Sequence, residues 1–115
     1  MLEINSEFRK GILFVRLNGE LSKKTIQILQ NEVTDIILKG GIQNVVFNMK
    51  LLNDIDMKGM NSLLHHYEIC KNRKGNCYIC DITNRDVYMK LKKNRILNYL
   101  HEINSELTLL QLLTV

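Results

Sequence analysis

The sequence of 115 residues contains no proline and no tryptophan, and aromatic residues make up only 6% of it. Without proline, no turn can depend on a cis X–Pro peptide bond. No apolar run approaches the roughly 20 residues that a membrane-spanning helix requires. Residues 1–7 carry acids and no apolar core, so we expect no signal peptide, a cytoplasmic location and no direct membrane insertion.

Cysteine is also scarce. Cys70, Cys77 and Cys80 are an odd number of thiols in a chain without an export signal, so we expect them to be reduced. Cys77 and Cys80 form a C-x-x-C, but residues three apart on a strand point to opposite faces. His66 is interpreted as a polar-edge histidine beside the core thiol of Cys70. Because no second ligand pair accompanies these residues, we predict no metal and no cofactor.

The sequence motifs of common catalytic sites are missing as well. It has no G-x-S-x-G elbow, P-loop, G-x-G-x-x-G or H-E-x-x-H. Asp54 and Asp56 lie close together, but paired acids near a turn are usually a cap and a solvated neighbour. The sequence therefore predicts a binding module and not an enzyme.

Strand and helix patterns alternate along the chain. The strands are expected at residues 2–8, 12–17, 45–49, 77–80 and, at an edge, 99–103. The helices are expected from Ser22 to Gly40, from Asp56 to about Asn72, from Thr83 to Ile96, and from Asn104 or Ser105 to Leu113. This order predicts an α/β fold in one domain, residues 1–115, with a four- to five-stranded mixed sheet, parallel central strands and about four packed helices.

Local signals set the expected ends and faces of these elements. Asn18-Gly19 indicates a turn, and the Asp56 carboxylate is expected to accept the backbone N–H of residue 58 or 59. The apolar positions of the first, third and fourth helices are expected to be Ile26, Leu29, Val33, Ile36 and Ile37, then Val87, Met89, Leu91 and Ile96, then Leu107, Leu110 and Leu113.

Three stretches, taken in order, resemble the STAS domain family of bacterial anti-sigma factor antagonists. The first is L-N-G-E-L at residues 17–21, before the first helix. The second is V-V-F-N-M at 45–49 followed by I-D-M-K-G-M at 55–60, which is similar to the family's strand and D-S-S-G-L helix start. The third is C-Y-I-C-D-I at 77–82, followed by a helix and a leucine-rich end.

The resemblance implies a STAS-like fold and a function. In such proteins the start of the second helix docks onto an anti-sigma factor, usually one of histidine-kinase-like ATPase fold, and releases a sigma factor. The anti-sigma factor can phosphorylate a serine of the motif, which breaks the complex. The positions implied to bind the partner here are Asp54, Asp56, Met57, Lys58, Gly59, Met60 and Ser62.

The motif departs from the family pattern at its serines. Met57 and Lys58 occupy the two serine positions, and Lys58 stands where the phosphoacceptor stands, so the usual switch is expected to be absent. Two interpretations of Lys58 stay open: a solvated side chain paired with Asp54, or a fixed positive contact to an acidic partner. Ser62, one turn further on, is expected to be a small packing or solvent-facing residue.

Other functions stay open at this point. A STAS subunit of a lipid or anion transport or sensory assembly, and a nucleotide-binding module near Asp54, are the alternatives. The formal net charge is +4, and the basic clusters lie at 71–74 and 90–95. Because no recognition helix or stacking motif accompanies them, we expect solvated faces that steer an acidic protein, not nucleic acid. The sequence leaves open the partner's identity and whether the chain is a monomer or a weak dimer.

Overall fold

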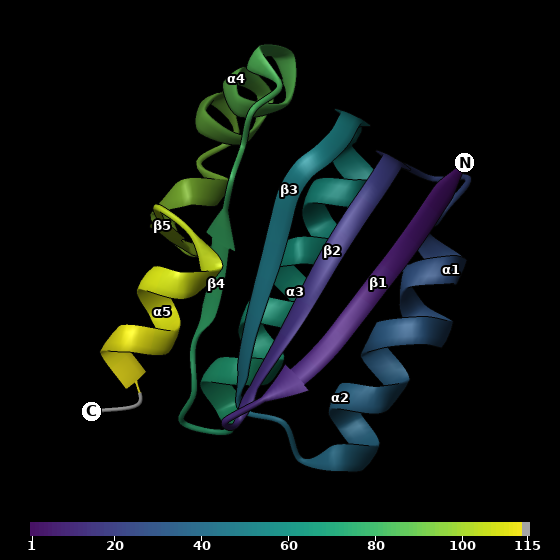
Figure 1. Cartoon of the computed structure of the whole chain (residues 1–115). Helices are drawn as coiled ribbons and strands as arrows, with labels where there is room; N and C mark the ends of the chain where they lie inside the picture. Colours follow the sequence, from purple (N-terminus) through teal and green to yellow (C-terminus); the bar gives the residue numbers. More distant parts are fainter. Residues whose placement is uncertain (114–115) are drawn as a thin grey trace.

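Five strands form one mixed sheet in the computed structural model, which describes residues 1–113, with side chains as far as Leu112 (Figure 1). The strand order is β1-β2-β3-β4-β5. The strands are β1 (Leu2–Arg9), β2 (Ile12–Leu21), β3 (Asn44–Ile55), β4 (Cys77–Cys80) and β5 (His101–Ile103). β1 and β2 pair antiparallel and all other neighbours pair parallel, which confirms the predicted mixed sheet.

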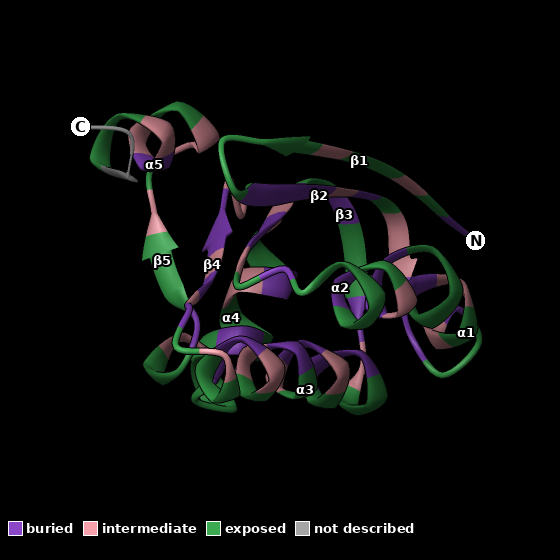
Figure 2. Cartoon of the chain, turned by 90° about the horizontal axis from the view of Figure 1, so that it is seen from below, coloured by how far each residue is buried: buried purple, intermediate pink, exposed green. Residues whose placement is uncertain are grey.

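The helices cover the two faces of this sheet unequally (Figure 2). They are α1 (Ile26–Leu29), a π-helical turn (Gln30–Thr34), α2 (Asp35–Gly40), α3 (Met57–Asn72), α4 (Arg85–Lys93), a 3-10 turn (Ile96–Asn98) and α5 (Glu106–Leu113). Helices α1 to α4 lie on one face and form the main core with it. Helix α5 lies on the other face, where Leu109 packs on a smaller cluster that includes Phe14 and Cys80. No helix in residues 1–113 is long and apolar enough to cross a bilayer.

The expected turn at Asn18-Gly19 is wrong, because β2 continues to Leu21. Glu20 N–H donates to the Met1 carbonyl at 3.0 Å, so the start of β1 holds this segment in the sheet. The register of β2 against β3 shifts between Gly19 and Glu20. Gly19 has φ +118°, and a Cβ there would lie 2.2 Å from the Met1 carbonyl oxygen. The glycine therefore permits an irregularity inside a strand and does not end it.

The first helix begins later than expected. Ile26 N–H donates to the Ser22 carbonyl at 3.0 Å, so Ser22 opens a turn and the helix starts one turn further on. The π-helical turn inserts a wider repeat, after which Ile37 is buried but Ile36 is 46% exposed. The prediction that Ile36 lies on the buried face, which assumed a uniform helical repeat, is therefore wrong. Gly41 ends the helix with φ +64°, as expected for a C-terminal glycine.

Two other helix faces differ from the expectation. In α4, Val87 and Leu91 are buried four residues apart, whereas Met89 points away and is 52% exposed. In α5, Leu109 is buried and Leu107 is 61% exposed, while the side chain of Leu113 lies outside the described residues. The helix turns this way because Glu106, three residues before Leu109, is held against the sheet.

The cysteines lie as the strand spacing predicts. Cys77 belongs to the main core, and Cys80 belongs to the cluster under α5, so their thiols are on opposite faces. Burial raises the pKa of the Cys77 thiol, and the neighbouring thiol of Cys70 raises it further. All three cysteines are free and buried.

Candidate functional site

The residues singled out between positions 54 and 62 meet at the carboxyl edge of the sheet. This is the edge at which the parallel strands β2 and β3 end and at which α3 begins (Figure 1). In sheets with parallel strands, ligands and partners commonly bind outside this edge. The site is therefore built from the ends of two strands, the loop after β2 and the first turn of α3.

Asp56 fixes the start of α3. Its Oδ1 accepts the Gly59 N–H at 2.8 Å, which confirms the predicted N-cap. Its Oδ2 accepts the Lys23 N–H at 2.9 Å, so the same carboxylate also holds the loop that follows β2. The Asp56 N–H donates to the Leu21 carbonyl at 3.2 Å. One residue thus joins the helix, the neighbouring loop and the sheet.

Gly59 lets α3 approach the sheet closely. A Cβ at this position would lie 2.2 Å from the Leu21 carbonyl oxygen and 2.9 Å from Ile55 Cγ1. No real Cβ tolerates such a contact with backbone, so a larger residue would push the helix outward. The glycine is required by packing against the end of β2, not by an unusual backbone angle.

Asp54 pairs with Lys90 of α4 and not with Lys58. Lys90 Nζ donates to Asp54 Oδ1 at 2.9 Å and to the Ile55 carbonyl at 3.2 Å. The hydrogen bond from Lys90 lowers the pKa of Asp54. The sequence interpretation in which Lys58 pairs with Asp54 is therefore wrong, and α4 is an additional part of the site.

The seven predicted site residues divide into an exposed layer and a supporting layer. Met57 is 53% exposed, and Lys58 and Asp54 are exposed as well. Gly59 and Met60 are buried beneath them. Asp56 and Ser62 are half-buried. Within residues 1–112, Lys58 makes no ion pair and no hydrogen bond through its side chain, so its ammonium group is available to solvent or to a partner.

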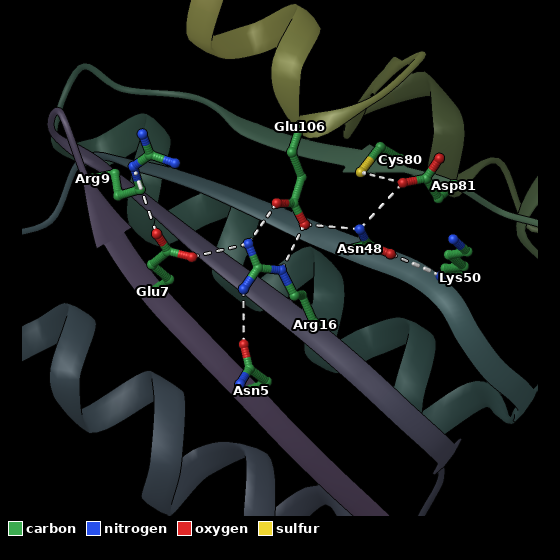
Figure 3. A network of polar contacts seen from close by, with 9 residues as sticks. All are labelled: Asn5, Glu7, Arg9, Arg16, Asn48, Lys50, Cys80, Asp81 and Glu106. Carbon is green, nitrogen blue, oxygen red and sulfur yellow. Dashed lines mark hydrogen bonds and ion pairs between the residues drawn. The ribbon is translucent and has the colours of Figure 1, made fainter.

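A second polar cluster lies on the opposite face of the sheet, beneath α5 (Figure 3). Glu106 accepts hydrogen bonds from Arg16 Nε at 3.0 Å and Nη2 at 2.7 Å. Asn48 Nδ2 donates to Glu106 at 2.8 Å and to Asp81 at 3.2 Å. Arg16 also bonds Glu7 and Asn5 of β1. This network connects α5 to three strands.

Sequence reasoning missed this network, although a signal existed. Arg16 and Asn48 are the polar residues in the expected apolar strands 12–17 and 45–49, and they face each other directly in the sheet register. The Arg16 hydrogen bonds lower the pKa of Glu106. Burial, aided by the charge of Asp81, raises the pKa of Cys80 to about 12, so this thiol is a poor nucleophile. The network acts as a clamp for α5 and offers no activated group.

His66 was also misinterpreted. Its side chain is only 1% exposed, which contradicts the expected polar edge. Nδ1 lies 2.7 Å from the Ser62 carbonyl, and Nε2 lies 2.7 Å from Thr34 Oγ1. Burial lowers the pKa of His66 to about 4. The histidine is a neutral core residue that joins α3 to the π-helical turn.

The described residues form no group of three or more histidine, cysteine or acidic side chains placed to hold a metal ion. His66 and Cys70 lie on the same helix, but both ring nitrogens of His66 already form hydrogen bonds with protein groups and are not free to bind a metal. What the site at the start of α3 offers is therefore a rigid surface with exposed apolar and cationic side chains, which is chemistry for binding.

Comparisons with known proteins agree with this fold. The STAS domain model matches residues 3–108. A relative in Paenibacillus polymyxa, named anti-sigma F factor antagonist, is 28% identical over 81 residues, which are 70% of this chain and 69% of that relative. The crystal structure of a putative anti-sigma factor antagonist from Thermotoga maritima has a TM-score of 0.87 at 12% identity, with 97% of this chain and 95% of that chain covered. A sulfate transporter family protein from Wolinella succinogenes has a TM-score of 0.75 at 20% identity, with 94% and 91% covered.

Proposed function

Because this chain belongs to the STAS domain family, we propose that it acts in the cytoplasm as an anti-sigma factor antagonist, in one domain of residues 1–115. Its partner in this proposal is an anti-sigma factor of ATPase fold, bound at the start of α3. The observation that supports it is the rigid first turn of α3, which carries the exposed Met57 and Lys58 beside a capped Asp56.

The first turn of α3 is suited to binding because it is ordered before a partner arrives. The Asp56 cap, its bond to Lys23 and the close contact of Gly59 with Leu21 fix the helix relative to the sheet. Ordering a loop on association costs free energy, and a surface that is already ordered avoids that cost. Met57 can supply apolar contact area, and Lys58 can supply a charge.

The same geometry implies binding without a serine switch. Lys58 has no hydroxyl group, so a serine kinase cannot modify this position. Lys58 also presents the opposite charge to a phosphoserine at the same place. We therefore propose that the complex is insensitive to ATP-dependent phosphorylation at position 58, and that Lys58 contributes a permanent positive contact.

A pair of charge reversals on one helix tests this proposal. Lys58→Glu places an acid where the family places a phosphate, and Lys71→Glu makes the same change in the last turn of α3. We expect calorimetry against the anti-sigma factors of the source genome to show weaker binding for Lys58→Glu and unchanged binding for Lys71→Glu. An acid near a helix N-terminus stabilises the helix by about 0.3–1 kcal/mol, so weaker binding could not be explained by unfolding.

Two outcomes would count against the proposal. Equal affinity of Lys58→Glu and the unmodified chain would remove the start of α3 from the interface. Binding to none of the anti-sigma factors, together with co-purification of a membrane transporter, would favour the transport-assembly alternative.

A further inference from the structure

Six exposed lysines lie on three separate segments that meet near the start of α3. Lys23 and Lys24 follow β2, Lys58 lies in the first turn of α3, and the others lie on α4. We call this surface the basic edge, and it consists of Lys23, Lys24, Met57, Lys58, Met89, Lys90, Lys92 and Lys93.

Hydrogen bonds show that the three segments are direct neighbours. Lys90 Nζ reaches Asp54 at 2.9 Å and the Ile55 carbonyl at 3.2 Å, which brings α4 to the end of β3. The Lys23 N–H reaches Asp56 at 2.9 Å, which brings the loop after β2 to the start of α3. These contacts place Lys23, Lys58 and Lys90 around the carboxyl edge of the sheet, and Lys92 and Lys93 follow Lys90 on α4.

The acids within the basic edge do not cancel its charge. Asp54 is paired with Lys90, and Asp56 is used to cap α3 and to hold the Lys23 N–H. Asp86, in the first turn of α4, is the third acid nearby. Glu20, opposite Asp54 in the sheet register, is the fourth acid nearby, and it pairs with the amino group of Met1. Six lysines against four acids leave this surface with an excess of positive charge.

Apolar side chains lie among these charges. Met57 is 53% exposed and Met89 is 52% exposed. Met89 and the stems of Lys90, Lys92 and Lys93 line an open hollow of about 380 Å³ on the surface of α4. Apolar contacts surrounded by charged groups are the usual composition of a protein interface. Methionine and lysine stems also adapt readily to the shape of a partner.

We propose that the basic edge binds an acidic face of a partner protein, in which carboxylates surround an apolar side chain that enters the hollow beside Met89. The inference rests on the proposed function and specifies the chemistry of the partner's docking face. Charge complementarity supports it, because a basic and an acidic surface attract each other and fix their relative orientation. It also gives α4, and not only α3, a part in recognition.

A protein fits this surface better than a membrane or a nucleic acid. Helix α4 buries Val87 and Leu91 in the core, so its apolar face cannot enter a lipid layer. Duplex phosphates would satisfy the lysines but would leave Met57 and Met89 in water. A partner with both carboxylates and an apolar contact uses every group that the surface exposes.

The chain provides a matched control at the far end of α3. Lys71 and Lys74 are exposed there, as Lys92 and Lys93 are on α4. Arg73 between them is occupied, because its guanidinium donates to the Leu38 carbonyl at 3.0 Å. The double variants Lys92→Glu/Lys93→Glu and Lys71→Glu/Lys74→Glu therefore change the net charge equally at two separate places.

The test is calorimetry of the full chain and both double variants with the anti-sigma factors of the source genome, at about 50 mM and about 300 mM NaCl. We expect Lys92→Glu/Lys93→Glu to raise the Kd about ten-fold at the lower salt concentration, and less at the higher one. We expect Lys71→Glu/Lys74→Glu to change the Kd less than about two-fold.

Binding that is equally affected by both double variants, or by neither, would overturn this inference while leaving the proposed function in place. No binding by the unmodified chain would overturn both. Retention on phosphatidylglycerol vesicles or on duplex DNA, lost in Lys92→Glu/Lys93→Glu, would assign the basic edge to those ligands instead and would also overturn it.

Discussion

The stability of this domain should depend on the protonation of one buried histidine. His66 Nδ1 faces the Ser62 carbonyl, which can only accept, so Nδ1 carries the proton. Nε2 then accepts from the Thr34 hydroxyl. The ring is neutral and 1% exposed, and a second proton would place a charge in the core. Lowering the pH should therefore destabilise the folded state by protonating His66.

The magnitude follows from the difference in pKa between the folded and unfolded states. Burial lowers the pKa of His66 to about 4 in the folded chain, whereas an unfolded histidine titrates near about 6.5. Between these values the unfolded chain binds the proton and the folded chain does not. The contribution of the neutral His66 to the free energy of unfolding is thus fully present above about pH 6.5 and is lost as the pH falls towards 4. From pH 7 to pH 5 the expected loss is about 2 kcal/mol.

Urea unfolding at pH 7 and pH 5 measures this loss. We expect His66→Gln to be less stable at pH 7 and to lack the histidine's part of the pH dependence, while His65→Gln, at an exposed neighbour, keeps it. The pKa values of Glu106 and Asp54 are lowered in the folded chain, so these two carboxylates change the free energy of unfolding below the usual carboxyl range and therefore outside the interval from pH 7 to pH 5. If His66→Gln and the unmodified chain lost equal stability between pH 7 and pH 5, the reasoning would be refuted.

Three further changes test the contacts at the start of α3 and beneath α5, each by urea unfolding. Gly59→Ala should destabilise the chain by about 1–3 kcal/mol because the added Cβ meets backbone atoms. Gly40→Ala is the control: its Cβ meets only side-chain atoms at 3.5 Å or more, so this change should be neutral or slightly stabilising. Equal effects of the two substitutions would contradict this prediction. Asp56→Ala should cost about 1 kcal/mol through loss of the cap, and no change would mean that the cap does not contribute. Glu106→Gln should cost about 2 kcal/mol by breaking the charged bonds to Arg16, and a value near zero would show that the network is dispensable.

The sequence was a good guide where one local signal decided the structure. Asp56 as an N-cap and the parallel central strands follow from short-range patterns, and the structure confirms them. The opposite orientations of Cys77 and Cys80 follow from the strand repeat alone.

The features that the sequence did not predict depend on contacts between distant segments. Asn18-Gly19 has the local signature of a turn, but Gly19 lies inside a strand because it packs against the distant Met1 carbonyl. The pairing of Lys90 with Asp54 joins residues 36 positions apart, and the pairing of Arg16 with Glu106 joins residues 90 positions apart. Ile36 left the expected face because a π-helical turn changed the helical repeat. None of these contacts has a signature within a short window of sequence.

We propose that this chain binds an anti-sigma factor with Lys58 at the position where the family carries a phosphorylatable serine. Calorimetry in the presence of ATP, followed by mass spectrometry of the mixture, tests it most directly, with Lys58→Ser as the comparison. We expect the unmodified chain to bind and to keep its mass, and we expect Lys58→Ser to gain one phosphate and then to bind less tightly. No binding by the unmodified chain, or a phosphate gained by it, would show that Lys58 does not replace a phosphorylatable serine in a complex with an anti-sigma factor.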